Sequence, residues 1–100
     1  MSDFHVARSL PLPGLGLLVL PQAPAPDWLA AHPLYTALQL RLHRPGFFPL
    51  PVPATVEEVA LADAPAARAL LLDADPGGEV GPGAWLELVA VAAPDWLFEE

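Results

Sequence analysis

Prolines limit the possible folds of this chain more than any other feature. The 100 residues include 14 prolines, which recur from Pro11 to Pro94. Proline has a fixed φ and no backbone N–H, so it breaks helices and is confined to the edges or ends of strands. Because 54% of the residues are hydrophobic and only 16% are charged, the chain is nevertheless far from the disordered class. It is therefore expected to fold as several short strands.

The clearest strand signal lies in the last third of the chain. Two apolar runs, residues 69–72 and 84–91, flank a segment with four glycines and two prolines, as strands separated by a turn-rich loop do. Side chains in the second run alternate between two faces. We expect one face to enter the core and Trp85, Val89 and Val91 to point outward.

Four further segments are predicted to be strands, at residues 4–12, 17–20, 34–44 and 47–61. The third is the clearest, because leucines alternate with polar residues along it. The first ends in repeated Leu-Pro and suits a sheet edge. Gly14 and Gly16 stand between the first two strands and predict a sharp bend or bulge there.

The last of these segments changes its apolar parity between Val56 and Val59. A shift by one residue would turn every later side chain to the other face of the sheet. We therefore expect a β-bulge near residues 57–58. The alternative is a helical turn over residues 55–62 that begins with a capping box.

The loop from Pro21 to Pro33 is expected to contain one short helical turn. Asp27 is predicted to act as its N-cap, and His32 followed by Pro33 to end it. Trp28, in the first turn, is expected to lie over an open end of the core.

Six short antiparallel strands with glycine bends predict a small closed all-β barrel, because closure removes exposed sheet edges. One hundred residues are enough for a single domain that folds without metals or disulfides. We expect the barrel to span residues 1–92 and an acidic, aromatic tail to follow at residues 93–100.

The order of these features resembles the second domain of the translation elongation factors of the Tu type, a small β-barrel. The resemblance rests on an apolar first strand, a Gly-x-Gly bend, an apolar second strand, a Val-Glu strand, a leucine run and a strand entered through glycine. These features lie at residues 4–12, 14–16, 17–20, 55–57, 70–72 and 80–86. The resemblance implies a barrel domain that stands without a GTPase domain. The family's tRNA-binding role belongs to the multidomain protein and is not carried over to any residue.

The charge balance makes nucleic acid an improbable partner. Twelve carboxylates face four arginines and no lysine, for a net charge of −8, whereas phosphate backbones bind through Lys and Arg. Only Arg41, His43 and Arg44 could begin a basic stripe. The longest apolar run, residues 15–20, is far below the roughly 20 residues that span a bilayer, so no membrane association is expected. We expect a cytoplasmic protein, and the composition is typical of a GC-rich bacterial genome.

No catalytic, cofactor-binding or metal-ligating set emerges from the sequence. There is no cysteine, and no hydroxyl residue lies in a strand-turn-helix elbow beside a histidine. His5, His32 and His43 lack a metal-ligand spacing. Residues 73–79 superficially resemble a calcium loop, but the third ligand position holds Gly77, which favours an ordinary acidic turn. We therefore expect no enzyme activity, cofactor or metal.

Surplus apolar side chains favour a protein-binding role. Trp96, Leu97 and Phe98 lie between acidic residues in the tail, and they could either fold back onto the barrel or bind a partner groove. The other candidates for protein binding are Trp28 and the expected outward-facing patch of Trp85, Val89 and Val91.

The sequence thus predicts a non-catalytic module that binds a protein partner of unknown identity. One alternative is a self-associating structural protein, such as a homodimer joined through the tail. Another is a translation- or RNA-associated factor.

Overall fold

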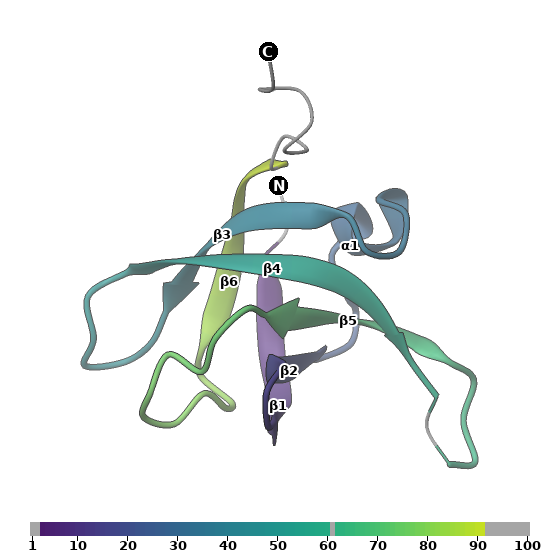
Figure 1. The fold of residues 1–100 in the computed structure, drawn as a ribbon, viewed down its shortest axis with the longest axis horizontal. Coiled ribbons are helices and arrows are strands. Elements are labelled where there is room, and N and C mark those ends of the chain that lie inside the picture. The colour runs from purple at the N-terminus through teal and green to yellow at the C-terminus, as the bar shows by residue number, and fades with distance from the viewer. Residues whose placement is uncertain (1–2, 61, 92–100) are drawn as a thin grey trace.

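The computed structural model describes residues 3–60 and 62–91. It shows a closed barrel of six antiparallel strands in the order β1-β2-β5-β4-β3-β6, with one short helix (Figure 1). The elements are β1 (Phe4–Leu12), β2 (Gly16–Pro21), α1 (Asp27–Ala31), β3 (Ala37–His43), β4 (Leu50–Val59), β5 (Ala67–Leu72) and β6 (Trp85–Val91). The predicted six-stranded all-β barrel is confirmed. None of the described residues belongs to a helix that is long and apolar enough to cross a membrane.

The long strand β4 explains how the barrel accommodates prolines. Its first half pairs with β3 from Leu50 onward, whereas its pairing with β5 begins only at Ala54. Pro51 and Pro53 lie in the first half, before the β4–β5 ladder begins. Pro53 still accepts a 3.0 Å hydrogen bond from the Asp73 N–H through its carbonyl, and a missing N–H is tolerated at the end of a ladder. The first half of β4 therefore extends with β3 as a hairpin arm beyond the β4–β5 pair (Figure 1).

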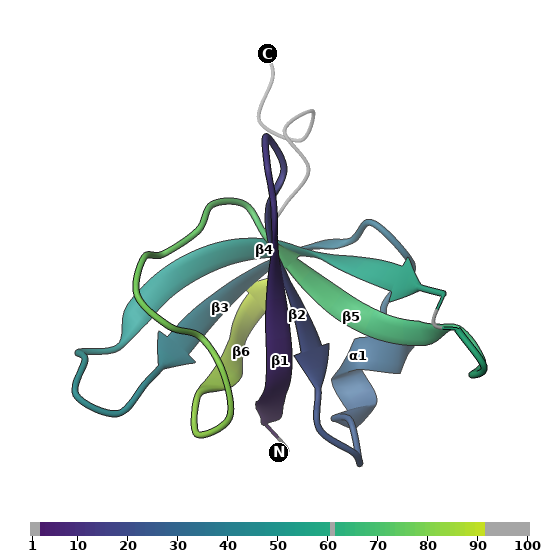
Figure 2. The same cartoon turned by 90° about the horizontal axis from the view of Figure 1, so that it is seen from below.

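Helix α1 closes one end of the barrel and contributes to its core. Trp28 and Leu29 are buried, and the Trp28 ring lies 6.4 Å from that of Phe4. Figure 2 shows α1 beside β5. The predicted helical turn and the place of Trp28 are confirmed, as is the end at His32. The predicted cap is wrong: Pro26 is the N-cap, and Asp27 is the first helical residue, without a side-chain capping hydrogen bond.

A second apolar cluster lies outside the main core. It contains the buried residues Leu18, Leu20 and Ala69, against which Leu12, Val59 and Leu71 pack. The Val59 side chain thus points away from the barrel interior, and the register of β4 does not shift. The predicted bulge is wrong, because β4 pairs with β5 in continuous register through residues 57–58. The alternative helical turn is also wrong, since the strand continues to Val59.

A bulge occurs in β6 instead. Gln39 pairs with Ala90 and Leu40 with Leu88, so Val89 is the extra residue. Directly paired residues place their side chains on the same face of a sheet. Val91 pairs with the fully buried Leu38, and so it takes the inward parity although it is half exposed. The expected outward stripe of Trp85, Val89 and Val91 is therefore interrupted by the bulge.

The bend between β1 and β2 depends on glycine. Gly14 and Gly16 both have positive φ, +80° and +134°. Gly16 also lies so close to β5 that a Cβ atom there would collide with the carbonyl oxygen of Leu72. The predicted glycine bend is confirmed, and Gly16 lets β2 approach β5 closely enough to pair.

Candidate protein-binding surface

The β3–β4 connection carries the most exposed aromatic residue of the described chain. We call residues 44–50, with the sequence Arg-Pro-Gly-Phe-Phe-Pro-Leu, the hairpin tip. Phe48 is 93% exposed, Phe47 55% and Leu50 36%. The tip lies at the end of the β3–β4 arm, away from the α1 end of the barrel (Figure 1). Its apolar side chains therefore cannot be part of the core.

Contacts within the hairpin tip, and one with the β5–β6 loop, hold the tip in place. The guanidinium of Arg44 lies 4.1 Å from the centroid of the Phe47 ring, a cation–π contact. The same guanidinium donates a 2.6 Å hydrogen bond to the Gly77 carbonyl. The backbone N–H of Phe47 closes the turn onto the Arg44 carbonyl at 3.1 Å. These contacts order the tip around the exposed Phe48.

Two shallow hollows border the tip. One, of about 280 Å³, is lined by Gly46, Phe47 and Phe48. The other, of about 240 Å³, lies toward the β5–β6 loop, where Arg44 and Phe47 share its lining with Glu79. Phe47 therefore separates an apolar hollow without an acidic residue from one that contains a carboxylate.

The hairpin arm lies in a segment of distinct charge. This segment, residues 28–56, contains no Asp or Glu, although the whole chain carries twelve. The same segment holds Arg41 and Arg44, two of the four arginines. The hairpin tip is thus an apolar and weakly cationic feature on an acidic protein.

The outer face of β3 and β6 carries a polar cluster around Trp85. The ring of His43 stacks on Trp85 with centroids 3.8 Å apart and an interplanar angle of 4°, and His5 lies 6.4 Å away on the neighbouring strand. Glu87 Oε1 accepts hydrogen bonds from His43 Nε2 and from Arg41, each 3.0 Å long. Imidazole rings thus cover Trp85, and Glu87 offsets the charge of Arg41.

These hydrogen bonds lower the pKa of Glu87. The bond from His43 makes the largest contribution, and burial opposes it by raising the pKa. The hydrogen bond and charge of Arg41 then lower the pKa further. An ionised carboxylate is a hydrogen-bond acceptor only, so His43 must donate through Nε2–H. The cluster links β3 to β6, and the stacked His43 ring covers one face of Trp85.

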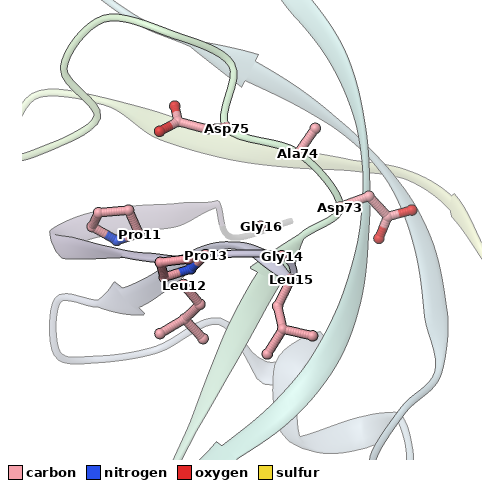
Figure 3. A pocket seen from close by; sticks show the side chains of 9 residues that line it. All are labelled: Pro11, Leu12, Pro13, Gly14, Leu15, Gly16, Asp73, Ala74 and Asp75. Atoms are coloured by element: carbon pink, nitrogen blue, oxygen red, sulfur yellow. The ribbon is translucent and has the colours of Figure 1, made fainter.

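A third hollow, of about 350 Å³, separates the β1–β2 turn from the start of the β5–β6 loop (Figure 3). Its carboxylates, on Asp73 and Asp75, point away from each other (Figure 3). Asp75 Oδ1 accepts a 2.9 Å hydrogen bond from the N–H of Gly77, so it closes its own acidic turn. Across residues 3–60 and 62–91, no three His, Asp or Glu side chains gather as a metal site would require.

The structure separates the residues that the sequence singled out for binding. Trp28 is 8% exposed and lies in the core, so it contributes nothing to an exposed binding surface. Trp85 is half-buried under His43, while Val89 and Val91 are each 51% exposed. The remaining three lie outside the described residues: Trp96, Leu97 and Phe98.

Sequence reasoning missed the hairpin tip. It assigned Phe47 and Phe48 to the start of a strand, whereas β4 begins at Leu50. A usable signal was present, because the two aromatics stand between Pro45-Gly46 and Pro49. Large apolar residues enclosed by turn formers are displayed by a loop more readily than buried by a strand.

No family model, curated protein or solved structure matches this chain. The resemblance to the second domain of the Tu-type elongation factors therefore stays a prediction.

Proposed function

We propose that this barrel is a non-catalytic protein-binding module that docks on its partner through the hairpin tip. The observation that carries the proposal is the 93% exposure of Phe48 on a tip that Arg44 and Gly77 hold in place. Transfer of a phenylalanine side chain from water into a protein pocket contributes about 1.5–3 kcal/mol. Aromatic residues of this kind are typical anchors of protein interfaces.

The chemistry of the tip favours a partner that combines apolar and acidic side chains. Phe48 would pack against the apolar groups, and Arg44 would face the carboxylates with those N–H donors that Gly77 does not use. The bacterial cytoplasm expected from the sequence is the proposed setting.

The test compares capture of a partner by the wild-type chain, Phe48→Ser and Leu15→Ser from a lysate of the source organism. Leu15 is the matched control, because it is 63% exposed and lies in the β1–β2 turn. Loss of a hot-spot aromatic costs 2 kcal/mol or more, so we expect Phe48→Ser to weaken capture by about 30-fold or more. Leu15→Ser should capture as the wild type does. Equal capture by all three chains would refute the role of the tip.

A further inference from the structure

We propose that the hairpin tip binds the acidic, aromatic segment at residues 94–100 of a second copy of this chain. This inference rests on the proposed function and names the partner. It joins two features of one sequence, the tip and the segment Pro-Asp-Trp-Leu-Phe-Glu-Glu.

The two segments are complementary in chemistry. The tip offers Phe47, Phe48 and the guanidinium of Arg44. The acidic segment offers three large apolar side chains and three carboxylates, and no Arg or Lys follows Arg68 in the chain. Aromatic pairs gain about 0.5–1.5 kcal/mol beyond the burial of their area. Hydrogen bonds between a guanidinium and a carboxylate are among the strongest in proteins.

The approach to the tip also fits an acidic segment. The hollow lined by Gly46, Phe47 and Phe48 has no carboxylate in its lining. Glu79 borders the separate hollow toward the β5–β6 loop. We therefore expect the apolar side chains of the second copy's segment to pack on the Phe48 side, where they meet no carboxylate. Arg44 lines the other hollow, so a carboxylate of the segment would reach its guanidinium past the Phe47 ring.

Chain geometry favours the segment of a second copy over that of the same molecule, because Trp96 of the same molecule does not reach Phe48. The pairing of Val91 with Leu38 and of Leu42 with Leu50 places Phe48 about six residue steps beyond Val91, or ~20 Å at the rise of a β-strand. Trp96 follows Val91 by five residues and reaches ~17 Å at most. Strand β6 also runs away from the tip, so the chain would first have to reverse direction.

Binding between copies therefore uses two different surfaces, a tip and a tail segment. Two chains that exchange these contacts reciprocally form a dimer, and chains that do not close the exchange add further copies. In either arrangement one intact tip and one intact tail make one contact.

The test measures the mass of the full chain by sedimentation from micromolar to millimolar concentration. The measured mass of the wild type and of Leu15→Ser should rise with concentration above the 10.6 kDa of one chain. Phe48→Ser and Trp96→Ser should each stay at the mass of one chain. A mixture of these two variants should associate, because it restores one intact tip and one intact tail. An excess of a synthetic peptide of residues 93–100 should lower the mass of the wild type.

Three results would each overturn the inference: a wild type that stays at one-chain mass throughout, association that persists in either variant, or a mixture that does not associate. The proposed function fails separately, when Phe48→Ser leaves the capture of partners from lysate unchanged. If the wild type stays at the mass of one chain and Phe48→Ser still loses capture, the binding role of the tip stands. Only the second copy is then ruled out as its partner.

Discussion

Gly16 provides a sharp test of how the barrel closes between β2 and β5. Its φ of +134° is a conformation that side-chain-bearing residues rarely adopt. A Cβ atom would also meet the carbonyl oxygen of Leu72, which is backbone and cannot move without disturbing the pairing of Leu17 with Leu72. Gly16→Ala therefore combines conformational strain with overpacking at a strand pair.

Both contributions can be given a magnitude. A residue held in a sparsely populated backbone region costs about 1–3 kcal/mol. Overpacking at a filled site costs a further 1–3 kcal/mol or so. We expect Gly16→Ala to lower the free energy of unfolding by about 2–6 kcal/mol, a large part of the roughly 5–15 kcal/mol typical of a domain.

Gly14→Ala is the matched control, because Gly14 also has positive φ but no atom lies within 4 Å of a Cβ placed there. Its cost should be limited to a left-handed backbone, about 1–2 kcal/mol. Both variants lose the same flexibility in the unfolded chain, so this effect cancels in their difference. Urea unfolding followed by tryptophan fluorescence measures both. Equal destabilisation of the two variants would refute the proposed close approach of β2 to β5.

The remaining predictions concern the core, the β3–β6 face and the tip. Leu70→Ala removes a fully buried side chain and should cost about 2–5 kcal/mol in urea unfolding; a loss below about 1 kcal/mol would contradict its place in the core. The folded pKa of Glu87 lies below its ordinary value, so the stabilisation from its hydrogen bonds is present above that value and is lost as the pH falls through the folded pKa. The free energy of unfolding of Glu87→Gln should therefore fall less on acidification than that of the wild type. An NMR titration of the Glu87 carboxyl group that finds no lowered pKa would refute this. Phe48→Ser should change the free energy of unfolding by no more than about 0.5 kcal/mol, because the residue is exposed; a larger loss would show that Phe48 supports the fold.

The strands could be predicted because their signals are local. Apolar runs, alternation and glycine bends located all six, and β1 was placed at its observed bounds, Phe4–Leu12. The bulge could not be located, because it depends on which strand lies opposite. Val59 changes parity to join a cluster with Leu18 and Leu20, which lie about forty residues away in sequence. No local pattern contains that contact.

The candidate surface was harder to predict for the same reason. Trp28 and Trp85 were singled out as large aromatics, but their exposure depends on Phe4, His43 and other partners distant in sequence. Phe48 was overlooked because alternation favoured a strand that begins three residues too early, at residue 47 instead of Leu50. Its exposure follows from the β3–β4 register, which places Leu50 opposite Leu42 and leaves the preceding aromatics in the turn.

The most direct measurement of the binding role places a photoreactive phenylalanine at position 48 of the full chain, with the same group at position 15 as control. After illumination in a lysate of the source organism, mass spectrometry locates the crosslinked peptides. The account predicts a protein adduct at position 48 that position 15 does not form. Adducts that are the same at both positions, or none at position 48, would contradict it.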